Sequence, residues 1–256
     1  MFELSGASPL CWPVQRWLPP GAAMPDAAAL SALAAGQGCE VAPGLPLRFV
    51  PPQADGLDYE QRIWTRGEVE TRPDNWHDLY NALVWLSFPA SKRALSAGHA
   101  AARLPEGGAR GAARDALCHF DECGVLVLSD RPELLALLQG FSWRALFVEA
   151  RAEVRAHMRF VIFGHALYDA LRAPFRGLTG KALLYPVDSE VLAGSAEALT
   201  AAVDALLAAD LAAGKLRRAR DLQPLPLLGV PGVTPDSEAP AYYDDVWQFR
   251  PGRRRV

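Results

Sequence analysis

The sequence lacks long apolar runs and has few cysteines. Among its 256 residues no uncharged apolar stretch reaches the ~18 residues that a membrane-spanning helix needs. The run 196–213 is largely apolar, but Glu197, Asp204 and Asp210 interrupt it. Residues 1–20 also lack the basic and apolar regions of a secretory signal peptide. With four cysteines and no secretory signal, the chain is expected in the cytoplasm, with reduced thiols and without membrane contact.

Charge of either sign is also scarce. Charged residues make up 21% of the chain and the formal net charge is −3, so no basic surplus indicates a nucleic-acid partner. Familiar catalytic motifs are missing too: no G-x-S-x-G, G-x-G-x-x-G or H-E-x-x-H occurs. Residues 177–181 do not match the phosphate-binding loop motif, because Phe175 and Ala182 stand where glycine and Ser or Thr are required.

What the sequence does contain is enough apolar surface for a sizeable core. Half of the residues are hydrophobic, and neither an internal repeat nor a linker is visible. We therefore expect one α+β domain over 1–256, mostly helical, with a short antiparallel hairpin or small sheet. An irregular N-terminal segment is expected over 1–24. An extended, Pro-rich C-terminal segment over 223–256 is expected to wrap around the body, because it is too apolar for a free tail.

Hydrophobic spacing and turn residues predict the individual elements. The predicted helices are 26–35, 76–88, 91–103, one from 130–132 to Gly140, 142–151, 165–171 and 195–213. The predicted strands include 157–163 and 181–187, and the predicted hairpins are 62–71 and 116–129. In the second hairpin Asp121-Glu122-Cys123-Gly124 is interpreted as the turn.

The stretch 76–88 is the most informative. At the α-helical period His77, Asp78 and Asn81 share one face near its start, and that face continues as Val84 and later apolar residues. A buried helix that opens with polar side chains needs partners for them. The three form either a catalytic or metal-binding cluster, or a capping network in which Asp78 caps the helix and the others satisfy backbone groups.

His165 is the second candidate. It follows Gly164 and opens a helix, where the positive end of the helix dipole lowers the pKa of an imidazole and favours the neutral form. Neutral imidazole suits base catalysis or metal binding, while packing is the simpler interpretation. Arg114, which follows a Gly-rich loop, and Lys181, which follows a two-glycine turn, are candidate cofactor-binding residues. His99 is expected on the surface.

Four segments resemble one known family. They are YEQRIWTRGEVETRPDNWHDLYNALVWLSFP, RDALCHFDECGVLV, FGHALYDALRAPFRGLTGKALL and PLPLLGVPGV with the later YYDDVWQFRP. In this order they resemble a bacterial family catalogued as domain of unknown function 3025. The resemblance covers this chain from about Tyr59 to Pro251. The resemblance implies a one-domain member of that family and carries no activity with it.

Two hypotheses of function follow from the residues. The first is a hydrolase-like enzyme acting on a small molecule, with His77, Asp78, Asn81 and His165 as its catalytic set and a divalent metal as the cofactor considered. The second is a non-catalytic binding or interaction domain in which the same groups form a structural network. A pocket holding two histidines and a carboxylate within metal-ligand reach would favour the first. We expect His77 and His165 to line one pocket, with Asp78 or Asn81 orienting His77. The oligomeric state is left open.

Overall fold

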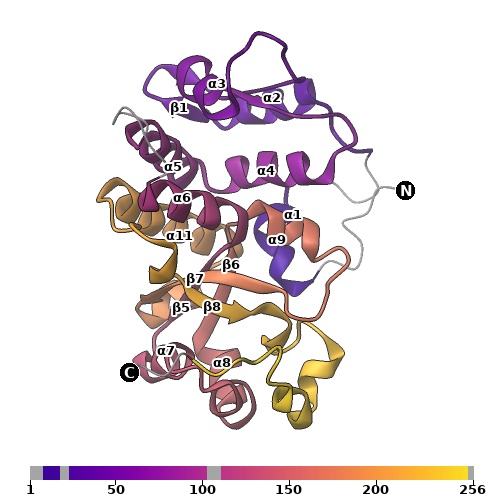
Figure 1. Ribbon diagram of the computed structural model, residues 1–256, viewed down its shortest axis with the longest axis vertical. Coiled ribbons are helices and arrows are strands. Elements are labelled where there is room, and N and C mark those ends of the chain that lie inside the picture. The colour runs from indigo at the N-terminus through magenta and orange to yellow at the C-terminus, as the bar shows by residue number, and fades with distance from the viewer. Residues whose placement is uncertain (1–7, 18–22, 103–110, 253–256) are drawn as a thin grey trace.

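A mixed four-stranded sheet lies below the long helix α4 in Figure 1. The computed structural model describes residues 8–17, 23–102 and 111–252. The strands lie in the order β6-β5-β7-β8, and their bounds are Met158–Ile162, Gly124–Ser129, Thr179–Pro186 and Gln223–Pro226. β5 runs parallel to β7, whereas β6 and β8 are antiparallel to their neighbours. All six residues of β5 are buried, which is typical of a strand covered on both faces.

Helices surround this sheet. α7 and α8 lie at the lower end of the molecule and α6, α9 and α11 lie nearer to α4 (Figure 1). The helical segments in this part are α6 (Ala112–Cys123), α7 (Pro132–Gln139), the π-helical turn η2 (Ala145–Glu149), α8 (Arg151–His157), α9 (His165–Ala170), α10 (Ser189–Ala193) and α11 (Ala196–Ala212). The predominantly helical α+β class expected from the sequence is confirmed.

The predicted hairpin over 116–129 is wrong in its first half. Residues up to Cys123 form α6, and only the second half is a strand. The buried residues Ala116, Leu117 and Phe120 follow helical spacing, so one face of α6 packs on the core. Asp121 and Glu122 therefore belong to the last turn of a helix, and Gly124 passes directly into β5.

Residues 27–70 form a separate N-terminal layer above α4 (Figure 1). It contains α2 (Ala27–Gly36), β1 (Glu40–Ala42), β2 (Leu45–Pro46), β3 (Arg48–Val50), α3 (Tyr59–Arg66) and β4 (Glu68–Glu70). The first two elements of the chain, η1 (Pro9–Cys11) and α1 (Trp12–Gln15), lie below α4, where α1 contacts α4 and α11 and η1 contacts β6. The irregular segment expected over 1–24 is thus wrong for 9–15, while 1–7 and 18–22 lie outside the described residues. β1 and β2 are antiparallel, and β3 and β4 are parallel.

The predicted hairpin over 62–71 is also wrong. Residues 62–65 lie in α3, which ends at Gly67 with a positive φ of 68°. β4 pairs instead with β3. The buried guanidinium of Arg62 joins the two elements, because it forms ion pairs with Asp55, with Glu68 at 2.9 Å and with Glu70 at 3.1 Å. This network fixes α3, whose N-terminal end faces the pocket described below.

α4 (Trp76–Ser87) is buried on nearly every side, as its apolar pattern predicts: every residue from Asp78 to Ser87 is buried. Asn75 caps it by accepting a hydrogen bond from the Asp78 backbone N–H at 3.0 Å. α5 (Pro89–Ala101) follows and packs against α11. The Asp204 carboxylate of α11 accepts hydrogen bonds from two backbone N–H groups at the start of α5, at 2.7 and 3.0 Å.

The C-terminal segment packs on the body. It adds β8 to the sheet and then continues in short 3₁₀ turns, because its prolines interrupt longer elements. These turns are η4 (Leu227–Gly229), η5 (Pro235–Glu238) and η6 (Pro240–Asp244), and η3 (Ala219–Asp221) precedes the strand. Leu225, Leu227, Tyr243 and Phe249 are buried, whereas Trp247 is exposed. Among the described helices, none has the length and apolar character to cross a bilayer.

Candidate metal centre

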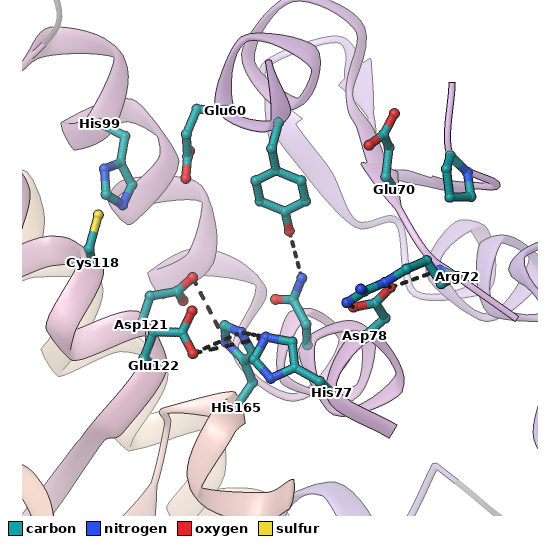
Figure 2. Close-up of a pocket in the computed structure, with 13 residues that line it drawn as sticks. Glu60, Glu70, Arg72, His77, Asp78, His99, Cys118, Asp121, Glu122 and His165 are labelled. Carbon is teal, nitrogen blue, oxygen red and sulfur yellow. Dashed lines mark hydrogen bonds and ion pairs between the residues drawn. The ribbon is translucent and has the colours of Figure 1, made fainter. Parts of the chain in front are cut away.

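A pocket of about 460 Å³ opens between the N-terminal layer and the helices below it. Its walls come from α3, β4, α4, α5, α6 and α9 (Figure 2). The lining residues are Pro52, Tyr59, Glu60, Glu70, Arg72, His77, Asp78, Asn81, His99, Cys118, Asp121, Glu122 and His165. Segments that are distant in the sequence therefore meet around one polar cavity.

Two imidazoles meet at one side of this pocket. His77 lies in the first turn of α4 and is half-exposed, whereas His165 is the first residue of α9 and is buried. Their Nε2 atoms are 3.1 Å apart, and the ring planes are inclined by 70°. The sequence-based expectation that the two histidines share one pocket agrees with this placement.

The carboxylate of Glu122 completes a triangle with the two imidazoles. Its Oε2 lies 3.6 Å from His165 Nε2 and 3.9 Å from His77 Nε2, and the three side chains point toward one another in Figure 2. The point equidistant from these three atoms is about 2.1 Å from each, which is the bond length of Zn²⁺ to imidazole nitrogen and carboxylate oxygen. Since that point lies in the plane of the three atoms, both sides of the plane remain for further ligands.

Gly164 explains why His165 lies beside Glu122. Its backbone packs directly on the junction of α6 and β5, where the N–H of Gly164 donates to the carbonyl of Gly124 at 2.9 Å. A Cβ at this position would lie 2.5 Å from the carbonyl oxygen of Glu122 and would collide with the neighbouring backbone nitrogens. Only glycine permits this approach, which brings the start of α9 against the end of α6.

Burial sets the charge state of His165. It lowers the pKa of this imidazole to about 4, although the nearby Asp121 carboxylate acts in the opposite direction. His165 is therefore neutral at neutral pH, as its position at a helix start predicts, but burial is the leading cause. Burial also raises the pKa of Glu122, while His77 opposes the shift. Protons on these groups compete with a metal ion for the same atoms.

Asp121 supports His165 from behind. Its carboxylate Oδ1 accepts a hydrogen bond from the Lys92 ammonium at 2.7 Å, and its Oδ2 lies 3.9 Å from His165 Nδ1. Burial alone would raise the pKa of Asp121, but the charge of Lys92 overcomes it and the pKa falls below its usual value. An anion on this side of the ring favours the proton on Nδ1, which leaves the Nε2 lone pair directed at the triangle.

Comparison with known proteins places the chain in a family. The family described as "Protein of unknown function (DUF3025)" matches residues 47–253. The chain belongs to this family. The match includes every residue that lines the pocket. No curated protein and no solved structure matches the chain.

Asp78 and Asn81 line the pocket of this DUF3025 protein, but they do not orient His77 as expected. The Asp78 carboxylate accepts hydrogen bonds from the backbone N–H, Nε and Nη2 of Arg72, each at 2.8 Å. The Asn81 amide is held by Lys92 and Tyr59. The orienting role is wrong because both side chains point along the pocket wall to these partners.

Two other predicted residues of the DUF3025 chain lie outside the described lining of this pocket. Arg114 is in the first turn of α6, at the opposite end of the helix from Glu122. Lys181 lies in β7, where it pairs with Gly124 across the sheet. The structure therefore does not bring the two candidate cofactor-binding residues to the histidines.

Several pocket residues were not recognised from the sequence. Glu122 and Asp121 were assigned to a turn, although the helical spacing of Ala116, Leu117 and Phe120 would have placed them on a helix. His99 was expected on the surface but is buried. Lys92 gave no signal of its own, because a lysine in an amphipathic helix is normally solvated.

Proposed function

We propose that this protein is a divalent-metal-dependent hydrolase whose metal ion is bound by His77, Glu122 and His165. The observation that supports it best is the triangle of Nε2, Nε2 and Oε2 atoms, which surround one point at metal–ligand distance beside the pocket. Two imidazoles and one carboxylate form a ligand set used by catalytic zinc sites, which keep a further position open for water. We propose Zn²⁺ as the ion, because its bond lengths to imidazole nitrogen and carboxylate oxygen match the distance of about 2.1 Å from the centre of the triangle.

Each ligand has a defined part in the chemistry. A bound Zn²⁺ lowers the pKa of a coordinated water to about 7, so that hydroxide is available at neutral pH. The imidazoles of His77 and His165 and the Glu122 carboxylate would hold the ion, and the pocket would admit the substrate from the open side. In such a hydrolysis the water oxygen would bond to the electrophilic atom of the substrate. One proton of the water would leave with the departing group, and the other would pass to solvent through the pocket mouth.

The alternative is a non-catalytic binding domain. The distance of 3.1 Å between the two Nε2 atoms also suits an N–H···N hydrogen bond, in which one imidazole donates to the other. In that case the cluster is a structural network and the Glu122 carboxylate has no ion to bind. Metal titration separates the two functions.

The test begins with chelator-treated, full-length protein titrated with Zn²⁺ in a calorimeter. We expect one ion per chain, and His77→Ala and Glu122→Gln should each weaken binding by more than about 100-fold, since each removes a direct ligand. His119→Ala is the matched control, because His119 is exposed on the same helix as Glu122. Wild-type protein that binds no zinc, or His77→Ala that binds it equally well, would refute the metal centre.

The second step measures hydrolysis. Chromogenic carboxylic and phosphoric esters are offered to the zinc-loaded and zinc-free proteins. The proposal expects activity that appears with zinc and disappears in Glu122→Gln. A protein that binds zinc through these residues and hydrolyses nothing in the panel would be a metal-binding domain, and the hydrolase proposal would be withdrawn.

A further inference from the structure

The directions of two hydrogen bonds can be deduced at the pocket wall. The Lys92 ammonium has only donors, so the Asn81 atom 3.0 Å from its Nζ is the amide oxygen. The Asn81 NH₂ group must then face Tyr59, and it donates to the phenolic oxygen at 2.6 Å. Tyr59 is therefore the acceptor in this contact, and its own O–H proton is directed elsewhere.

The free direction of the Tyr59 hydroxyl is the pocket. Although 37% of the residue is exposed, its hydroxyl end lies inside, among the lining groups. Burial, followed by the charges of Asp121 and Glu60, raises the pKa of Tyr59 well above its ordinary value. The phenol therefore keeps its proton at neutral pH and can donate it in a hydrogen bond. Among the described residues, the hydrogen bond of the Tyr59 hydroxyl is the one that it accepts from Asn81.

The charge of the lining restricts the substrate. Arg72 is the one permanently cationic residue among the described lining groups, and the Asp78 carboxylate occupies its Nε and Nη2. The lining carboxylates are Glu60, Glu70, Asp78, Asp121 and Glu122. Glu70 and Asp121 are paired in turn with Arg62 at 3.1 Å and with Lys92 at 2.7 Å. Each of these three cations, at or beside the lining, is thus already bound to a carboxylate. A phosphate dianion would have to compete with the carboxylates for these cations, whereas an uncharged acyl group needs none of them.

Building on the hydrolase function, we propose that the substrate is an amide or ester of a carboxylic acid, and that Tyr59 donates a hydrogen bond to its carbonyl oxygen. The water oxygen forms a bond to the carbonyl carbon, and the π electron pair moves to the carbonyl oxygen, which Tyr59 then stabilises. When this pair restores the C=O bond, the bond to the leaving nitrogen or oxygen breaks. The leaving nitrogen or oxygen takes one proton of the water and the other proton passes to solvent, so the products are a carboxylate and an amine or alcohol.

Lys92 and Asn81 are positioning residues in this arrangement. Neither donates to the substrate: Lys92 fixes the orientation of the Asn81 amide, and that amide fixes Tyr59 as a donor toward the pocket. The positive charge of Lys92 also polarises this series of hydrogen bonds, which strengthens the one that Tyr59 donates to the substrate.

The substrate class is tested with two compounds that share one leaving group. Zinc-loaded, full-length protein is given p-nitrophenyl acetate and p-nitrophenyl phosphate, and rates are taken relative to the zinc-free protein. The zinc-dependent rate with the acetate should exceed that with the phosphate. Acetohydroxamic acid, an acyl mimic that binds metal ions, should compete, and inorganic phosphate should not. A preference for the phosphate ester would overturn the substrate class.

The role of Tyr59 is tested by Tyr59→Phe. This variant should bind zinc like the wild type but lower kcat by about 100–1,000-fold with little change in KM, as the loss of one oxyanion donor does. Asn81→Asp should cause a similar loss, because the new carboxylate attracts the hydroxyl proton away from the pocket. Tyr185→Phe, which removes a phenol bonded to Asp210 outside the pocket, is the control.

The outcomes separate this inference from the proposed function. If wild-type protein fails to bind zinc, the metal centre itself is wrong. If zinc binds and the acetate is hydrolysed, but Tyr59→Phe has the wild-type kcat, the metal centre survives and the role of Tyr59 is overturned. Reduced kcat in Tyr59→Phe with unchanged zinc affinity supports the inference.

Discussion

At the residue scale, Lys92 is the most unusual side chain near the pocket, because it is buried and binds two of the lining residues. Only 3% of its side chain is exposed, and its ammonium lies 2.7 Å from Asp121 and 3.0 Å from Asn81. Replacing Lys92 by Met keeps the volume but leaves the Asp121 carboxylate as an unpaired buried charge. We expect Lys92→Met to lower the free energy of unfolding by about 3–5 kcal/mol, measured by urea denaturation.

A second ion pair provides the control. Lys215 binds Asp210 at 2.6 Å, but 67% of its side chain is exposed, so Lys215→Met should cost less than about 1 kcal/mol. Adding Asp121→Asn to Lys92→Met should restore part of the lost stability, because the unpaired charge disappears. Equal effects of the two lysine substitutions would show that the burial of Lys92 has no energetic consequence.

The residues in and around the pocket show which single residues a sequence can identify and which it cannot. His77 and His165 could be selected because each stands beside a visible boundary, the start of a buried helix and the end of a β-rich run. Glu122 and Lys92 could not, because their importance arises from partners more than twenty residues away. Contacts of that kind depend on tertiary packing, which local spacing does not encode.

At the scale of elements, the junction of α6 and β5 was the main error of the sequence-based prediction. The letters Asp-Glu-Cys-Gly are typical of a turn, and the buried run that follows them was correctly identified as a strand. Here the same letters end a helix, because Phe120 and Leu117 are needed on the core. The helix 76–88 was predicted almost to the residue, since its apolar pattern and its Asn75 cap agree.

The close approach at this junction predicts the effect of Gly164→Ala. The added methyl group would collide with the backbone at the end of α6 and push His165 away from Glu122. We expect zinc affinity to fall by at least about 10-fold, and stability to fall by about 1–3 kcal/mol, the usual cost of overpacking. Both are measured on the same protein, by calorimetric titration and by urea denaturation.

Gly36→Ala is the matched control for this substitution. Gly36 is the last residue of α2, and a Cβ there would meet no atom within 4 Å. Because alanine favours helix more than glycine does, this variant should be as stable as the wild type or more stable by up to ~1 kcal/mol. If Gly164→Ala binds zinc as tightly as Gly36→Ala, the contact between α9 and α6 does not position the site.

At the scale of the whole molecule, the three proposed ligands come from α4, α6 and α9 and meet only in the folded chain. A ligand that binds only the folded state stabilises it by about 2.7 kcal/mol at a free concentration of 100 Kd. We therefore expect zinc to raise the Tm of the full-length protein in scanning calorimetry. The Tm of Glu122→Gln should not respond to zinc, and that of His119→Ala should rise like the wild type.

The C-terminal segment packs against the rest of the molecule. Two of its aromatic residues, Phe249 and Trp247, differ in burial: 4% of Phe249 is exposed, against 50% of Trp247. The Phe249 ring packs 4.8 Å from that of Tyr243 and covers Gly229, where a Cβ would lie 2.5 Å from its edge. Trp247 lies on the surface between the guanidinium groups of Arg176 and Arg250.

This difference gives a test of whether the segment is part of the cooperative core. Phe249→Ala should lower the free energy of unfolding by about 3–5 kcal/mol, because it leaves a cavity between buried rings. Trp247→Ala removes a larger side chain from the surface and should cost less, about 1 kcal/mol. Both variants should still unfold in a single calorimetric transition, since the hydrophobic core forms one continuous cluster that includes Phe249 and Tyr243. Equal, small losses in both variants would mean that the C-terminal segment rests on the body without stabilising it.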